Sequence, residues 1–363
     1  MTDTDTDTNT DTDTDTTLLN GPAGLRPATV DVHAHLAVPA VDALVADEPG
    51  LRAQQDADAV SMGCPSLAYN RAQIAKLGPR LTDLGLRVAA MDLAGVDVQA
   101  VTPLPSPHAW ADRSLAERIV ATTNEAVTRY CQQEPSRLLP VGTVALQHPD
   151  LAVAQLTTAM RELGMRGVQI ATSAAPGVEL DDPSLAPFWA AAEQLGAAVL
   201  IHPWGCSLGP RLADYYLFNT VGNPVETALA LSRLLLSGLL GRHPGLRLWS
   251  AHGGGYLPSY IVRADHAWHV RGDARTTDQP PSALLRRTYV DSLVYTPEQL
   301  RHLVHIMGPD RVTLGSDYPF DMGVEDPVDR LLAAGLDQAT VTAIRGGNAA
   351  RLLGPLPTRS TSL

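Results

Sequence analysis

The 363-residue sequence lacks any apolar run near the roughly 20 residues that a membrane-spanning helix needs, so we expect no membrane partner. Its N-terminus has no basic segment followed by an apolar stretch, which argues against a secretory signal. No run of basic residues is present, so we expect no nucleic-acid partner. Cysteine is scarce, because only three occur and they have no paired metal-binding spacing. We therefore predict reduced thiols in a cytoplasmic protein.

Negative charge is concentrated at the N-terminus. The net charge is −12, and six aspartates alternate with threonine within residues 1–16. Such a segment has no core-forming side chain and repels itself. We therefore expect a disordered tail over 1–24, one folded body over 25–354 and a second, short tail over 355–363.

Hydrophobic residues make up 45% of the chain, which is ample for a core, and they gather in short β-rich runs between longer amphipathic stretches. The β-rich runs are 28–33, 96–101, 138–144, 167–170, 197–202, 246–252, 289–294 and 312–317. The helical patterns cover about 115–132, 151–163, 185–195, 224–240 and 297–307. Strands separated by helices need crossover connections and pair in parallel. Eight such units predict an α/β fold, a (β/α)8 TIM barrel.

Two features refine this prediction. An open doubly wound sheet is the alternative, but no glycine-rich phosphate loop follows the first predicted strand. Residues 47–86 exceed what a minimal barrel needs, and their Gly-Cys-Pro and Leu-Gly-Pro sequences indicate turns. We predict that this segment is a small insertion over the barrel mouth.

Polar side chains at the ends of the predicted strands point to a metal site. His33 and His35 are two apart, so they face the same side at the mouth where barrel enzymes keep their chemistry. His202 ends the fifth strand, His252 the sixth and Asp317 the eighth. Buried imidazoles and carboxylates are costly unless they are paired or bind metal. Three histidines and one aspartate suit a divalent ion such as zinc, with a position left for water.

The motifs around these residues resemble the amidohydrolase superfamily, and within it the aminocarboxymuconate-semialdehyde decarboxylase branch. The resemblance covers about residues 28–353. It is carried by Val-Asp-Val-His-Ala-His at 30–35, Ile-His-Pro-Trp at 201–204, Gly-Asn-Pro-Val-Glu-Thr-Ala at 222–228, Ala-His-Gly-Gly-Gly at 251–255 and Leu-Gly-Ser-Asp-Tyr-Pro-Phe at 314–320.

The resemblance implies roles for five residues. His33, His35, His202 and Asp317 would bind the metal, and His252 would be the acid/base group that handles the metal-bound water. An imidazole titrates near neutrality and can therefore take and return a proton. Many amidohydrolases use a carboxylated lysine to bridge two metals. The only lysine here is Lys76, outside the predicted strands, so we expect a single ion.

The resemblance also suggests substrate contacts. Arg263 resembles an arginine that holds a substrate carboxylate and can reach the neighbouring subunit's site, which implies a homodimer. Trp204 follows the fifth-strand histidine and would form a wall of the pocket, with core packing as the alternative. A second family arginine falls in the insertion, where Arg71 and Arg80 are both candidates.

The resemblance implies a metal-dependent, non-oxidative decarboxylase of an unsaturated or aromatic carboxylic acid. The alternative is a hydrolase of the same superfamily that cleaves a lactone or amide, since both reactions use an activated water. We expect zinc, with manganese as the second candidate, because ligand type alone does not fix the metal.

Overall fold

A computed structural model describes residues 28–106 and 108–357. The tail expected over 1–24 and most of the one expected over 355–363 lie outside these residues. Among the described residues, no helix combines the length and apolarity needed to cross a lipid bilayer.

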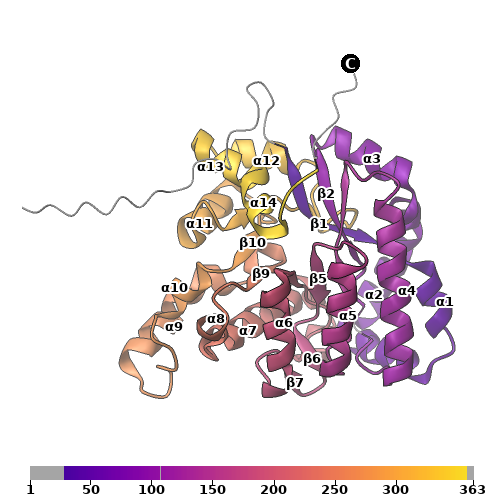
Figure 1. Cartoon of the computed structure of the whole chain (residues 1–363), viewed down its shortest axis with the longest axis horizontal. Helices are drawn as coiled ribbons and strands as arrows, with labels where there is room; N and C mark the ends of the chain where they lie inside the picture. Colours follow the sequence, from indigo (N-terminus) through magenta and orange to yellow (C-terminus); the bar gives the residue numbers. More distant parts are fainter. Residues whose placement is uncertain (1–27, 107, 358–363) are drawn as a thin grey trace, which may run out of the picture.

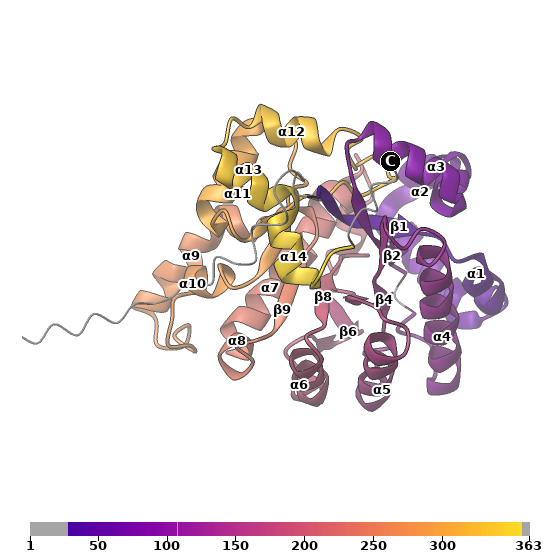
Figure 2. The same ribbon diagram turned by 45° about the horizontal axis from the view of Figure 1, so that its top comes forward.

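Short parallel strands form two sheets that join into one ring, which confirms the predicted (β/α)8 barrel. Figures 1 and 2 show the strands in the interior with helices around them. The ring is built from β1 (Val30–Leu36), β2 (Val98–Pro103), β3 (Leu138–Pro140) with its continuation β4 (Gly142–Thr143), β5 (Gly167–Ile170), β8 (Ala198–Ile201), β9 (Arg247–Ser250), β10 (Tyr289–Asp291) and β11 (Val312–Thr313). The last strand closes on the first, because Val32 N–H donates to Leu314 O and Asp317 N–H donates to His33 O. A small antiparallel hairpin, β6 (Ser173–Ala175) and β7 (Val178–Glu179), follows β5 and was not predicted.

Helices surround the strands, as the amphipathic stretches predict (Figure 2). They are α1 (Pro39–Val45), α2 (Pro49–Thr82), α3 (Leu84–Leu93), α4 (Arg113–Cys131), α5 (Pro149–Arg161), α6 (Ala186–Leu195), α7 (Asn223–Leu236), α8 (Leu239–Arg242), α9 (Leu257–Val270), α10 (Pro281–Leu285), α11 (Pro297–Met307), α12 (Pro327–Ala333), α13 (Gln338–Thr342) and α14 (Asn348–Leu353). The pattern expected over 224–240 is divided between α7 and α8 at Gly238, whose φ of 75° breaks the helix.

Two apolar layers hold the barrel. The inner cluster fills the ring with side chains such as Val30, Leu200 and Trp249, and Leu352 of α14 packs into the same cluster. The outer cluster joins the other face of the strands to the surrounding helices. The interior below the site is thus a packed core rather than a pore, as is usual for this fold.

A β-bulge in β1 sets the direction of its histidines. The register to β2 shifts between Asp31 and Ala34. Val30 and Val32 belong to the inner cluster, and His35 lies opposite Thr102 further along the strand. A bulge adds one residue and re-aims the side chains that follow. The strand can therefore place valines in the inner core and both histidines in the barrel mouth.

The predicted insertion is helical rather than a series of turns. Residues 49–82 form α2, which is kinked at Gly63 (φ 72°, ψ 155°). Gly63 ends the first half and Pro65 lies in the first turn of the second, where its missing N–H costs little. Gly63 also lies against the Ala213 carbonyl, where a Cβ would collide. The α2 helix therefore packs on the segment after β8, beside the barrel mouth.

Candidate metal centre and active site

Four buried side chains meet at the C-terminal mouth of the barrel. His33, His35, His202 and Asp317 each offer one ligand atom, and these atoms all lie within 4.8 Å of one another. The residues are at most 5% exposed. Histidines from the first and fifth strands and an aspartate after the eighth are thus brought together, as the sequence predicts.

The spacing of the donor atoms fits one divalent ion. His33 Nε2 lies 3.1 Å from His35 Nε2 and 3.2 Å from His202 Nε2. Asp317 Oδ1 lies 3.0 Å from His35 Nε2 and 3.3 Å from His33 Nε2. Tetrahedral ligands at metal–nitrogen distances of about 2.0–2.1 Å are separated by about 3.3 Å. These residues form a divalent metal site.

The Nδ1 atom of each of the three histidines lies close to a hydrogen-bond acceptor. His33 Nδ1 lies 2.7 Å from Asp291 Oδ2, His35 Nδ1 lies 3.2 Å from Pro103 O, and His202 Nδ1 lies 2.9 Å from Pro203 O. A carbonyl or carboxylate oxygen accepts a proton from Nδ1. Each Nε2 can therefore turn a lone pair toward the common centre, the arrangement found around metal-bound histidines.

Burial and charge set the protonation of the site. Burial lowers the pKa of His35 and brings that of His202 well below its usual value, so both are neutral ligands at neutral pH. Burial also lowers the pKa of His33, but the nearby carboxylates outweigh it and raise the value to about 9. A bound cation therefore has to displace one proton from this ring before its Nε2 offers a lone pair. The Asp317 carboxyl has a pKa well below its usual range, because the neighbouring histidines outweigh the effect of burial. The ionised carboxylate supplies the negative charge that a divalent cation needs.

Asp291 is a site residue that the sequence analysis missed. It ends β10 and is fully buried. Besides holding His33, it accepts hydrogen bonds from the N–H groups of His252 (2.9 Å) and Gly253 (2.8 Å). The available signal was an aspartate within the seventh predicted strand, 289–294, which the structure ends at Asp291.

His252 adjoins the four ligands without joining them. Its Nε2 lies 3.6 Å from Asp317 Oδ2, and its ring packs on those of His33 and His202 at centroid distances of 5.3 and 5.2 Å. The backbone of His252 has φ 56°, and the three glycines that follow also have positive φ. This left-handed turn, fixed by Asp291, directs the imidazole toward the metal centre.

A buried arginine lies behind the ligands. Arg87 of α3 is fully buried and donates hydrogen bonds to the His35 carbonyl, to Gln99 Oε1 (2.7 Å) and to the Tyr130 hydroxyl (3.0 Å). Gln99 in turn donates to Asp31 Oδ2 at 2.9 Å. This network compensates a buried positive and a buried negative charge and fixes the strand that carries His33 and His35.

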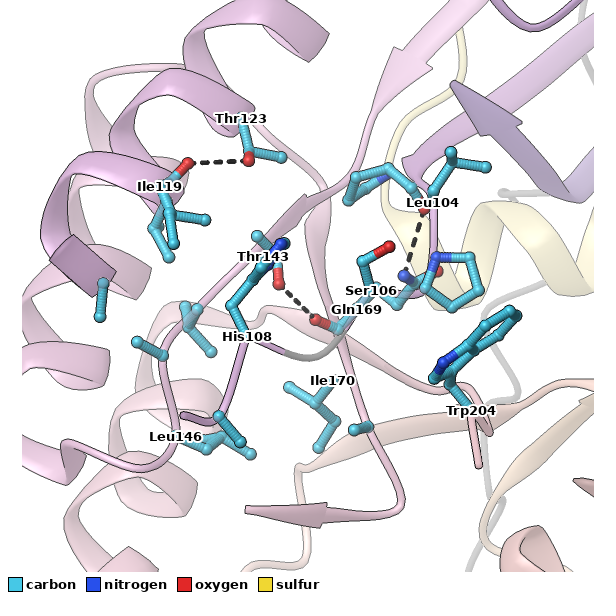
Figure 3. A pocket seen from close by; sticks show the side chains of 18 of the residues that line it. Leu104, Ser106, His108, Ile119, Thr123, Thr143, Leu146, Gln169, Ile170 and Trp204 are labelled. Atoms are coloured by element: carbon cyan, nitrogen blue, oxygen red, sulfur yellow. Dashed lines mark hydrogen bonds between the residues drawn. The ribbon is translucent and has the colours of Figure 1, made fainter. Parts of the chain in front are cut away.

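The predicted substrate residues lie at different places. Trp204 lines a pocket that begins at His202 and extends over the ends of β2, β4 and β5 (Figure 3), and its indole N–H donates to Asp58 of α2 at 3.2 Å. Arg71 is exposed on α2 and Arg263 is exposed on α9. Neither of them lines this pocket or the hollow beside His252. Their substrate roles remain predictions.

Arg80, the other candidate in the insertion, lies outside the pocket at His202. Its guanidinium pairs with Glu325 at 2.9 Å and stacks on the Tyr318 ring at 5.0 Å. Its placement therefore favours a structural contact between α2 and the segment after the eighth strand.

The chain is similar to proteins of known activity. The amidohydrolase family model matches residues 30–354. A 2-amino-3-carboxymuconate-6-semialdehyde decarboxylase from Dictyostelium discoideum is 34% identical, over 76% of this chain and 78% of its own.

Solved structures of decarboxylases are similar to this chain over most of its length. A 5-carboxyvanillate decarboxylase from Sphingomonas paucimobilis has a TM-score of 0.77 and 27% identity, covering 90% of this chain and 98% of its own. A 5-carboxyvanillate decarboxylase from Novosphingobium aromaticivorans, solved with bound manganese, has a TM-score of 0.77 and 25% identity, covering 90% and 97%. The chain belongs to the amidohydrolase family, in its aminocarboxymuconate-semialdehyde decarboxylase-like branch.

Proposed function

We propose that this protein is a metal-dependent, non-oxidative decarboxylase of an unsaturated or aromatic carboxylic acid. One observation carries the proposal: a buried site of three histidines and one aspartate with a further histidine, His252, directly beside it. The decarboxylase relatives support the reaction type. No feature of the described residues specifically favours the lactone or amide hydrolase that the sequence left open.

The protein's own groups account for the proton movement. When bound, the divalent ion supplies a positive charge that holds and polarises the substrate. His252 Nε2 delivers a proton to the carbon that bears the carboxylate, and the C–C bond then breaks. Its electron pair stays on the substrate and carbon dioxide leaves, so C–CO2− becomes C–H. Asp317 Oδ2, 3.6 Å from His252 Nε2, orients this imidazole. No redox cofactor is required.

Metal identity and number are part of the proposal. Three imidazoles and one carboxylate suit zinc, and we propose one zinc ion per chain with manganese as its competitor. A relative with bound manganese supports the second metal. Elemental analysis of protein loaded from an equimolar zinc and manganese mixture tests this order.

We also propose that the protein is a homodimer in the cytoplasm. A homodimer would let the exposed Arg263 act at the neighbouring subunit's site. Light scattering tests the dimer, and restored activity in a mixture of His252→Asn and Arg263→Ala chains tests the shared site. The described cysteines are all free thiols, which supports the reducing cytoplasm as the compartment.

Carbon dioxide release tests the reaction itself. Metal-loaded protein is incubated with a set of aromatic and unsaturated acids, and gas and products are followed together. We expect carbon dioxide and the decarboxylated product in equal amounts from at least one acid. A ring-opened or amide-cleaved product without carbon dioxide would assign the hydrolase instead.

A further inference from the structure

The pocket beside His202 has few charged side chains in its lining. Its walls are largely apolar, with Leu104, Ile119 and Leu146 among them (Figure 3). No arginine or lysine occurs among its described lining residues, whereas one carboxylate, Asp42, does. A group that carries a second negative charge would therefore find no cation of this chain in the pocket.

Its threonine hydroxyls present acceptors. Thr143 Oγ1 donates to the Gln169 carbonyl at 3.1 Å, and Thr123 Oγ1 donates to the Ile119 carbonyl at 2.8 Å (Figure 3). A hydroxyl has a single proton, so each oxygen offers only lone pairs to a ligand. Burial lowers the pKa of His108 in the same lining, so this imidazole adds no positive charge at neutral pH.

Gln169 adds a third acceptor, and this one is both buried and without a hydrogen-bond partner among the described residues. The residue is 5% exposed, and its side-chain Oε1 has no hydrogen-bond partner among the described residues. The orientation of the amide is fixed, because Nε2 donates to Pro103 O at 3.2 Å and a carbonyl oxygen can only accept. Pro103 O also accepts from the metal ligand His35, so the amide lies close to the metal centre. A buried acceptor without a partner is costly, which favours a donor supplied by a ligand.

We propose that Gln169 Oε1 accepts a hydrogen bond from a hydroxyl or amino substituent of the substrate, in a pocket whose described lining contains no cation of this chain. The carboxylate lies at the metal site, and the donor-bearing part of the ring occupies the pocket at Gln169. The substrate class rests on the proposed decarboxylase function, whereas ligand binding by Gln169 does not.

The test is a comparison of matched substrates. Metal-loaded wild type and Gln169→Met are assayed on benzoic acids with a hydroxyl at each ring position and on their methoxy counterparts. Met keeps the length of the side chain and removes the acceptor. We expect wild type to prefer the best hydroxy acid about tenfold in kcat/KM, and this ratio to fall to within about twofold of unity in Gln169→Met.

Two controls separate this effect from a structural one. Gln338→Met makes the same change on α13, outside the pocket, where the exposed Gln338 amide donates to Thr342 Oγ1, and should preserve the hydroxy/methoxy ratio. The second control is calorimetry, which measures the binding of the non-reactive phenols and anisoles to each metal-loaded protein. The ratio of their affinities reports the hydroxy/methoxy preference without turnover.

The outcomes are distinct. An unchanged ratio in folded, metal-loaded Gln169→Met would overturn the role of Gln169. If no acid releases carbon dioxide but phenol binding still depends on Gln169, the reaction is wrong and the binding role stands.

Discussion

The Asp291 carboxylate lies 2.7 Å from His33 Nδ1 and also accepts the N–H of His252, so one buried side chain positions both a metal ligand and the proposed acid/base group. The Asp291 pKa is lowered, because the hydrogen bond and charge of His33 outweigh the effect of burial. The ionised Asp291 carboxylate is thus a buried hydrogen-bond acceptor next to the metal ligands.

Replacing Asp291 should weaken metal binding. Asp291→Asn keeps the shape of the side chain but removes the charge that orients His33, and loss of such a partner lowers metal affinity about 10- to 100-fold. Competition with a fluorescent chelator measures the affinity. Asp273→Asn removes an exposed carboxylate paired with Arg271 and should leave it unchanged. Equal affinities in Asp291→Asn and wild type would contradict the positioning role.

Replacing His252 should separate catalysis from metal binding. Asn is the appropriate substitute, because it tolerates the left-handed backbone found at this position (φ 56°). We expect kcat to fall about 10²- to 10⁴-fold, the usual contribution of a general acid or base. Metal content should stay at the wild-type value, because His252 is outside the ligand set. A loss of metal in this variant would make His252 a ligand instead.

Two arginines that stack on Tyr318 should differ in their effect on stability. Arg80 and Arg87 both lie 5.0 Å from the ring centroid, but only Arg87 is fully buried. Arg87→Met leaves several buried acceptors without a donor and should lower the free energy of unfolding by about 3 kcal/mol. Arg80→Met removes a partly exposed pair with Glu325 and should cost less than about 1 kcal/mol. Urea unfolding measures both, and similar losses would contradict the network.

Thiol reactivity tests burial independently of the site. Burial raises the pKa of Cys131 to about 12 and that of Cys206 to about 11, so both stay protonated and weakly nucleophilic at pH 8. Cys64 is exposed. Iodoacetamide at pH 8 should therefore label Cys64 first, as read by peptide mass spectrometry. Rapid labelling of Cys131 in the folded protein would show that α4 is packed differently.

The sequence predicted the parts of this molecule that follow from local pattern. Strand order and the ligand positions could be anticipated because apolar runs end in His or Asp at one level of the barrel. Asp291 was missed because its role depends on two partners from other strands. The bulge in β1 and the burial of Arg87 likewise arise from packing between elements, which periodicity along one element does not contain.

Two arginines were predicted at the site from their motifs, but the structure places them elsewhere. Arg71 and Arg263 were singled out by their motifs, yet both are exposed and lie outside the hollows at the metal centre of this chain. A motif gives a residue type and a place in the order of elements. It does not give the direction of a long side chain on a helix, nor a contact made across subunits.

Metal content and carbon dioxide release, measured on the same samples of wild type and His33→Ala/His35→Ala, test the central claim most directly. We predict about one divalent ion per wild-type chain, with carbon dioxide released from a hydroxylated aromatic acid, and the loss of both in the double variant. A wild-type chain that holds no ion after reconstitution, or a double variant that still releases carbon dioxide, would contradict a metal-dependent decarboxylase.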